Sequence, residues 1–384
     1  MAKELCVLDV RSNTVTLATG ECSNKGLINI TGIATEEYEG YFDGQWLNSS
    51  TFEDAVSKAY HHLPPHLGHE VLYVSVPSAF CRFYGDVFYD KISESSVITA
   101  KLLDSIAERG TLTAGISYDI IQKCALGYKV DGGEAVTDPI GMSGGRLESF
   151  LSYIMCHKSF ATVINNILPA TESSRAEYIC SAHAQAMTLL DPSYRSSGEI
   201  FVDLGFLECS VAGVRGDGLQ GLESVTTGAA VIAADLTESL GVDIYAAMSL
   251  FGQIDLMSDY DDGSFYSVPQ EDGKVLRYRS VEINEVVRNS IKNIAAKLSG
   301  VMGAVADDES CKRIFATGDA IFNIRGAIKY LAKCLNKSIT PLSPNVVGYD
   351  DTRYSSLISL MRQAQIRKSE SGFISRIISK LRRA

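Results

Sequence analysis

The chain carries LCVLDVRSNTVTLAT at residues 5–19 and EIFVDLGFLECSVAG at residues 199–213, two stretches with one pattern. Each is an apolar run that ends near an aspartate, Asp9 or Asp203, and continues through a turn into an alternating run. Alternation of apolar and polar residues predicts β-strands, and a turn between two of them predicts a hairpin. When the two aspartates are aligned, apolar residues match apolar residues. We infer that the chain consists of two related halves.

Helix and strand patterns follow the hairpin in each half, which predicts an α/β protein. Thr51 can cap a helix over FEDAVSKAYHHL, because its hydroxyl can accept a hydrogen bond from the first turn. Residues 255–274 are acidic, aromatic and rich in turn formers, and we interpret them as a surface loop or a short hairpin. Further elements are predicted as a strand over 71–77 and as helices from Thr227 to about Leu240, from Asp243 to near Gly252, and over 281–302.

The composition is that of a folded, soluble protein. The 384 residues are 46% apolar and include 35 Lys and Arg against 46 Asp and Glu, for a net charge of -11. An acidic average argues against nucleic-acid binding, which depends on cations that neutralise phosphates. No apolar run reaches the ~20 residues of a membrane-spanning helix, and no signal peptide precedes the first strand pattern, so we expect a protein that is not exported. The 9 cysteines lack C-x-x-C spacing, which favours free thiols in a reducing compartment.

The C-terminal segment reverses this charge. Basic residues predominate after Arg362, first in a polar stretch and then in ESGFISRIISKLRRA at 370–384. At about 100° per residue, the large apolar side chains of this segment share one face of a helix and the basic ones the other. Such a helix suits the interface of an anionic membrane, and the alternative is a terminal helix docked on its own domain. The predicted membrane-binding residues are Phe373, Ile374, Arg376, Ile377, Ile378, Lys380, Leu381, Arg382 and Arg383.

The two aspartate turns are similar to the phosphate-binding turns of the actin, Hsp70 and sugar-kinase superfamily. There, glycines let backbone N–H groups approach the phosphates, a hydroxyl donates a further bond, and the aspartate organises Mg²⁺ and its waters. Two such turns half a chain apart are more specific than one. The resemblance implies two lobes with a nucleotide between them.

The segment YKVDGGEAVTDPIGMSGGRLE at 128–148 resembles the segment that marks FtsA, the actin-like bacterial cell-division protein. Other stretches resemble FtsA in the same order, among them YFDGQWLNSSTFEDAV, SGEIFVDLG, VTTGAAVIAADL and FATGDAIFNIRG. The resemblance extends from about residue 4 to residue 384, with few identities between the motifs. It implies an α/β, two-lobed actin/Hsp70-like fold with an FtsA-type inserted subdomain and a C-terminal amphipathic helix. The implied domains are 1–84, 164–197 and 345–361 for the first-lobe core, 85–163 for the inserted subdomain, 198–235 and 301–344 for the second-lobe core, 236–300 for its upper subdomain, and 362–384 for a linker and membrane-targeting helix.

The phosphate motifs depart from the family pattern. Where the family has D-x-G-S, this chain has DVRS at 9–12, and Arg11 could pair with a phosphate or fill its site. After Gly205, the sequence FLE at 206–208 replaces small residues, and a carboxylate there should repel an anion. We therefore expect ATP and Mg²⁺ to bind weakly or not at all. The candidate nucleotide site consists of the residues that keep family positions together with Arg11, which replaces a glycine: Asp9, Arg11, Ser12, Asp203, Gly205, Gly228, Thr317 and Gly318.

Other positions are weaker candidates for a functional role. Tyr245 and Met248 stand where the resemblance places a Glu and a Lys facing the nucleoside. Gln185 falls where actins orient the attacking water, but we interpret it as a helix-surface residue and assign no catalytic residue. The histidines between 61 and 69 lie in a loop with few carboxylates nearby, so we predict no metal site there.

The resemblance implies an adaptor that tethers filaments of the tubulin-like FtsZ to the cytoplasmic face of the bacterial membrane at the division site. Its implied partners are the FtsZ C-terminal tail, copies of itself, inner-membrane lipids and other divisome proteins, with no nucleic acid. Two alternatives remain open. One is an active actin-like ATPase, and the other is a scaffold of the PilM type for pilus assembly.

Overall fold

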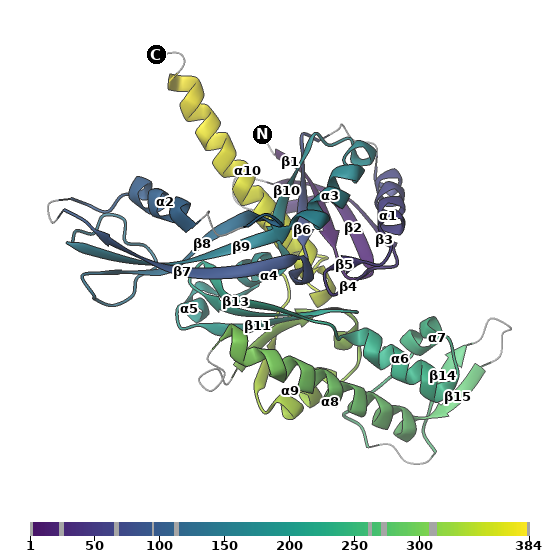
Figure 1. The fold of residues 1–384 in the computed structure, drawn as a ribbon. Helices are drawn as coiled ribbons and strands as arrows, with labels where there is room; N and C mark the ends of the chain where they lie inside the picture. The colour runs from purple at the N-terminus through teal and green to yellow at the C-terminus, as the bar shows by residue number, and fades with distance from the viewer. Residues whose placement is uncertain are drawn as a thin grey trace.

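The computed structural model describes residues 3–22, 27–64, 69–93, 96–110, 115–259, 263–269, 275–306 and 313–381. The chain forms two lobes, each around a five-stranded sheet, and a three-stranded sheet extends beside the first lobe (Figure 1).

The central strand of the first-lobe sheet, β1, is buried on both faces. The sheet order is β10-β6-β1-β2-β3, in which β1, β2 and β3 form an antiparallel meander and β6 and β10 run parallel to β1. Cys6, Leu8 and Val10 pack toward α1 (Ser49–His62) and α3 (Lys158–Ile167), whereas Leu5 and Val7 pack toward α10 (Ser355–Leu381). This two-sided burial explains the nearly continuous apolar run at the start of the chain. The strands are β1 (Lys3–Val10), β2 (Thr14–Cys22), β3 (Ile28–Glu37), β6 (Val71–Val76) and β10 (Arg175–Cys180).

The second-lobe sheet repeats this topology, with the order β13-β12-β11-β16-β17. Its first three strands form a meander, and β16 and β17 run parallel to β11. Asp9 lies opposite Thr16 in the first hairpin, and Asp203 lies opposite Ser210 in the second. The prediction of two related halves is thus confirmed. The strands are β11 (Glu199–Leu204), β12 (Cys209–Arg215), β13 (Gly218–Val225), β16 (Arg313–Gly318) and β17 (Ser338–Pro341).

One helix separates the two lobes. Helix α4 (Ser181–Leu189) buries Ala182 and Ala186 against Phe201 of β11, and Ala184 in the cluster that contains β1 and α10. Because both sides of α4 are covered, small residues follow one another along it without a helical period.

The three-stranded sheet has β9 (Arg146–His157) between β7 (Cys81–Lys91) and β8 (Tyr118–Val130), with α2 (Ala100–Arg109) packed on it. The segment 138–142 lies in the β8–β9 connection. It is held by backbone bonds between Ile98 and the loop, N–H of Ile98 to Met142 O at 2.9 Å and N–H of Gly141 to Ile98 O at 3.0 Å. Ile140 and Met142 point outward, with exposures of 51% and 39%. The DPIGM segment is therefore an ordered loop that presents apolar side chains.

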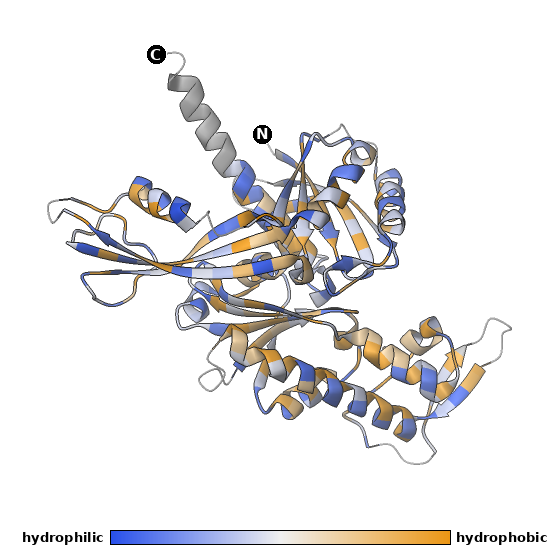
Figure 2. Cartoon of the chain, viewed as in Figure 1, coloured by the Kyte–Doolittle hydropathy of each residue, from blue (hydrophilic) through white to orange (hydrophobic). Residues whose placement is uncertain are grey.

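Helices cover the outer part of the second lobe. They are α6 (Ala229–Leu240), α7 (Ile244–Ser249) and α8 (Ser280–Val305), beside a hairpin of β14 (Phe265–Pro269) and β15 (Val275–Arg279). Ile283, Val287, Ile294 and Leu298 lie on the buried face of α8, at helical spacing. Figure 2 shows hydrophilic and hydrophobic residues alternating along this helix. The helices predicted from the sequence are confirmed, and part of 255–274 belongs to the hairpin.

Helix α10 differs from its prediction. It runs without a break from Ser355 to Leu381, where the sequence predicts a linker after residue 361. Ala364 is buried, and the Arg367 guanidinium donates to the carbonyls of Tyr178, at 2.8 Å, and Ile121, at 3.1 Å, so the body still holds the helix there. The side chains of the predicted membrane-binding residues lie outside the described residues, as do Arg382 and Arg383 entirely. Within the described chain, no helix is both long and apolar enough to cross a membrane.

Helix α1 begins two residues before its predicted cap. Asn48 is the N-cap, and its side chain accepts from the N–H of Ser50 at 3.2 Å, whereas the Thr51 hydroxyl donates to Asn48 O at 2.9 Å. The remaining elements are β4 (Tyr41–Phe42), β5 (Gln45–Trp46), η1 (Ser78–Phe80), η3 (Pro169–Thr171), α5 (Pro192–Arg195), η4 (Ala320–Asn323), α9 (Ala327–Leu335) and η5 (Thr352–Tyr354).

Candidate functional site

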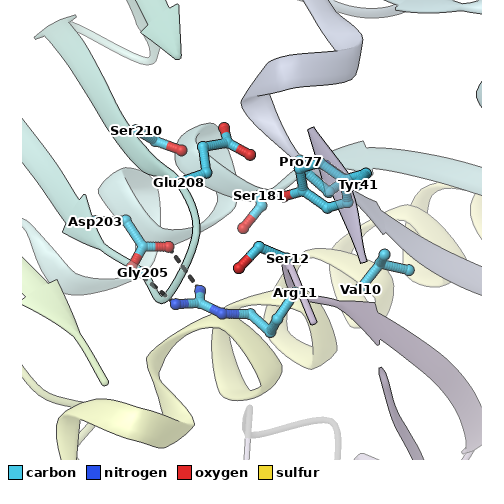
Figure 3. Close-up of a pocket in the computed structure, with 10 residues that line it drawn as sticks. All are labelled: Val10, Arg11, Ser12, Tyr41, Pro77, Ser181, Asp203, Gly205, Glu208 and Ser210. Atoms are coloured by element: carbon cyan, nitrogen blue, oxygen red, sulfur yellow. Dashed lines mark hydrogen bonds and ion pairs between the residues drawn. The ribbon is translucent and has the colours of Figure 1, made fainter. Parts of the chain in front are cut away.

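The β1–β2 turn of the first lobe faces the β11–β12 turn of the second, and an ion pair joins them (Figure 3). Arg11 Nη1 lies 2.6 Å from Asp203 Oδ2, and Nη2 lies 3.1 Å from Oδ1. The two side chains are 19% and 7% exposed. Burial alone would lower the pKa of Arg11, but the charge of Asp203 raises it, so the guanidinium stays protonated. The predicted residues Arg11 and Asp203 therefore bind each other.

Gln185 of α4 adds a second bond to this pair. Its Nε2 donates to Asp203 Oδ2 at 2.8 Å and to Ser181 Oγ at 3.1 Å, and the residue is fully buried. The interpretation of Gln185 as a surface residue is thus wrong, because α4 lies between the lobes. Asp203 already accepts from Arg11 and Gln185, which leaves little of its carboxylate for an outside ligand.

Asp9 lies beneath the turn, bound to hydroxyl groups. Its Oδ1 accepts from Ser75 Oγ at 2.9 Å and from Ser356 Oγ, at the start of α10, at 2.6 Å. Burial raises the pKa of the Asp9 carboxyl, although Arg11 and the two hydroxyls act in the opposite direction. The residue is therefore more a structural anchor than an open ligand.

The second turn makes its own contacts to the first lobe. The N–H of Leu207 donates to Ser12 Oγ at 3.0 Å, and Glu208 Oε1 accepts from the N–H of Ala79 at 3.1 Å. Glu208 Oε1 also accepts from Ser224 Oγ at 2.7 Å within the second lobe. Burial raises the pKa of the Glu208 carboxyl. Leu207, through its backbone, and Glu208, through its side chain, thus bridge the lobes.

The N-terminus of α6 is a position suited to anions, but its first two N–H groups are already hydrogen-bonded within the chain. The N–H of Ala229 donates to Gly205 O at 3.1 Å, and that of Ala230 to Phe206 O at 2.9 Å. A Cβ on Gly228 would lie 2.3 Å from Phe206 O, and one on Gly205 would lie 2.3 Å from Glu208 O. Both predicted glycines are needed because backbone packs on backbone here.

The second lobe also contributes Thr317 and Gly318, at the end of β16. The Thr317 hydroxyl donates to Ser355 Oγ of α10 at 2.6 Å. Gly318 has φ 147°, and a Cβ there would lie 2.3 Å from Leu204 O. Burial raises the pKa of Asp319, the next residue, while Arg11 lowers it. Tyr245 of the second lobe places its Oη 3.5 Å from Glu37 Oε2 of the first.

The cavity left between these groups is small. Its volume is about 20 Å³, which holds about one water molecule. The predicted residues Arg11, Ser12, Asp203 and Gly205 line it, while Tyr41, Pro77 and Ser181 were not predicted, because nothing local in their sequence marks them. In this arrangement the side chains leave no room for a phosphate. The cavity is lined by Val10, Arg11, Ser12, Tyr41, Pro77, Ser181, Asp203, Gly205, Glu208 and Ser210.

No group of three or more His, Cys, Asp and Glu side chains is arranged to hold a metal ion among the described residues. A Mg²⁺ ion brought by a nucleotide would meet Asp203 with both carboxylate oxygens bonded to Arg11, and Glu208 with Oε1 bonded to Ala79 and Ser224.

Known proteins resemble this chain in sequence. A family model described as the SHS2 domain inserted in FtsA matches residues 90–155. Cell division protein FtsA of Buchnera aphidicola subsp. Schizaphis graminum is 20% identical over 381 residues, which cover 92% of this chain and 89% of that protein. Cell division protein FtsA of Streptococcus pneumoniae serotype 2 is 21% identical over 375 residues, which cover 92% of this chain and 78% of that protein.

Solved structures agree on the fold. A chain of the PilM-PilN type IV pilus biogenesis complex has a TM-score of 0.62 at 9% identity, over 94% of this chain and 98% of that chain. MreB5 of Spiroplasma citri bound to ADP has a TM-score of 0.56 at 10% identity, over 96% of this chain and 98% of that chain. These proteins have the actin-like ATPase fold, which confirms the predicted fold class. The chain thus has an actin-like fold, resembles FtsA over 92% of its length and has a match to the SHS2 domain inserted in FtsA.

Proposed function

We propose that this protein is an FtsA-like cell-division adaptor, which tethers FtsZ filaments to the cytoplasmic face of the bacterial membrane at the division site. The observation that supports it most is the combination of the SHS2 match at 90–155 with similarity to proteins named cell division protein FtsA over 92% of the chain. The domain boundaries predicted from the sequence are part of this proposal, with 85–163 as the inserted subdomain.

The membrane contact is assigned to the C-terminal end of α10. The body holds this helix through Arg367, and Lys368 donates to Glu4 O, so the segment that follows starts at the surface of the first lobe. Its apolar face and its cations, as written in the sequence from Phe373 to Arg383, suit an anionic bilayer, where each cation near the surface contributes about 1 kcal/mol. One short helix binds weakly, so self-association of the protein would strengthen binding through effective concentration.

The FtsZ tail is assigned to the upper part of the second lobe, 236–300. Several large apolar side chains are exposed there, which is typical of a protein-binding surface. Their exposures are 67% for Tyr245, 48% for Met257, 48% for Phe265, 57% for Val275 and 40% for Leu276. Self-association and contacts to other divisome proteins are assigned to the remaining surface by resemblance to FtsA alone.

Two measurements on the full chain test this proposal. Deleting residues 370–384 should abolish co-sedimentation with anionic vesicles, and pelleting that survives the deletion would contradict the membrane contact. Leu276→Asp should weaken binding of an FtsZ-tail peptide in a fluorescence titration, because it places a charge on the apolar surface. Val347→Asp is the matched control, since Val347 is 100% exposed but lies outside this part of the lobe.

A scaffold of the PilM type is the second candidate. It is favoured by the TM-score of 0.62 to the chain of the PilM-PilN complex, which reports on fold alone. Binding of a membrane partner's short peptide in place of the FtsZ tail would support it. The active ATPase is less well supported, because the cavity of about 20 Å³ has no room for the phosphates.

A further inference from the structure

We propose that the side chains of this chain take the place of a nucleotide and hold the two lobes together themselves. We call Arg11, Ser12, Asp203 and Glu208 the inter-lobe latch. Nucleotides bind between the lobes in the superfamily that the chain resembles, and the bound ligand contacts both. Here the same position contains direct bonds from lobe to lobe. The inference goes beyond the adaptor function and does not depend on it.

The latch is made of contacts that cross from the first lobe to the second. Arg11 binds both carboxylate oxygens of Asp203, at 2.6 and 3.1 Å, and a bidentate pair of this kind fixes orientation as well as distance. The N–H of Leu207 in the second lobe donates to Ser12 Oγ in the first, and the N–H of Ala79 in the first lobe donates to Glu208 Oε1 in the second. None of these bonds needs a ligand.

The charges also favour a latch over a phosphate site. Arg11 interacts directly with Asp203 and electrostatically with Asp9 and Asp319, and Glu208 lines the same small cavity. A nucleotide would bring further negative charge into this group and would have to displace Asp203 from Arg11 to be neutralised. The N–H groups at the start of α6, which would otherwise attract an anion, are bound to the carbonyls of Gly205 and Phe206.

The consequence is that one arrangement of the lobes persists without ligand. In this chain the groups that join the lobes are part of the protein itself, so their effective concentration is fixed and does not depend on a ligand. We therefore expect the protein to keep this arrangement of the lobes at every nucleotide concentration.

Hydrogen–deuterium exchange on the full chain tests the latch. Arg11→Ala should raise exchange about tenfold or more in peptides that cover both turns, 9–14 and 203–210, because it leaves Asp203 buried without its cation. Arg109→Ala is the matched control, since it removes a 2.6 Å Arg–Asp pair that lies within the inserted part of the chain. If Arg11→Ala exchanges like wild type at 203–210, the latch is refuted.

A second variant and a second measurement cover the case in which Arg11→Ala fails to fold. Arg11→Lys keeps the charge but loses the second bond, and it should raise exchange at the same peptides by a smaller factor. Calorimetric titration of wild type with ATP and Mg²⁺ up to about 1 mM should show no saturable binding, and saturable binding would overturn the inference. Vesicle and FtsZ-peptide binding report on the adaptor function separately, so failure of one proposal leaves the other intact.

Discussion

Gly228 is where a single methyl group should have a large effect. The residue precedes α6, and the next two N–H groups bind the β11–β12 turn, Ala229 to Gly205 O at 3.1 Å and Ala230 to Phe206 O at 2.9 Å. A Cβ at position 228 would lie 2.3 Å from Phe206 O and 2.4 Å from Gly205 O. Both neighbours are backbone atoms, so the helix and the turn must separate in Gly228→Ala.

The size of the effect follows from the bonds that break. Two backbone hydrogen bonds at about 0.5–1.5 kcal/mol each give a loss of about 1–3 kcal/mol in the free energy of unfolding. For a lobe of this size, each kcal/mol lowers the midpoint of thermal unfolding by about 2–4 °C. Urea unfolding followed by circular dichroism, with a fixed protein concentration, measures the loss directly.

A Gly→Ala substitution at Gly303 should instead raise the free energy of unfolding. Gly303 lies inside α8, and a Cβ there would meet no atom within 4 Å. Gly303→Ala should therefore stabilise the protein by about 0.5–1 kcal/mol, through helix propensity. If Gly228→Ala is as stable as wild type or more so, the close approach of α6 to the turn is not as described, and the reasoning fails.

Three further outcomes are expected. Burial raises the pKa of Glu208, so the folded chain keeps this proton to higher pH than the unfolded chain, and stability falls as the pH rises above the ordinary value of 4.5 until it passes the raised one. Glu208→Gln should remove that part of the slope in denaturant midpoints, and an unchanged slope would argue against it. Arg367→Ala leaves two carbonyls of β8 and β10 without their donor, so limited proteolysis should cut α10 sooner; equal cleavage rates would contradict the docking. A maleimide should label exposed Cys334 in the folded protein but not Cys6, whose thiol is buried with a pKa of about 12, and equal labelling would show the packing of β1 to be wrong.

Much of the fold could be predicted because its signals are local. The alternation around Asp9 and Asp203 marks each hairpin, and the spacing of Ile283 and Val287 marks the buried face of α8. The departures from the phosphate motif at Arg11 were also visible in the sequence. These patterns depend on residues a few positions apart, so a single chain is enough to find them.

The arrangement of the site could not be predicted, because its partners are distant in the chain. Arg11 and Asp203 are separated by 192 residues, and Ala79 and Glu208 by 129. Gln185 lacked any signal of burial, since α4 is covered on both sides and so has no polar face for comparison. The sequence left open whether Arg11 would hold a phosphate or fill its site, and only the approach of the second lobe decides between them.

Helix α10 gives the molecule a mechanical property. Its first turn touches both lobes, through Ser355 to Thr317 and Ser356 to Asp9, and the helix then runs on to Leu381. At ~1.5 Å per residue, its 27 residues form a rod about 40 Å long. Because buried Ala364 and the hydrogen bonds of Arg367 hold α10 on the first lobe, the helix moves with that lobe as one rigid piece. With its far end anchored in a bilayer, α10 would pass the orientation of the membrane to the first lobe, and the inter-lobe latch would pass it to the second, so that the body keeps one tilt over the membrane.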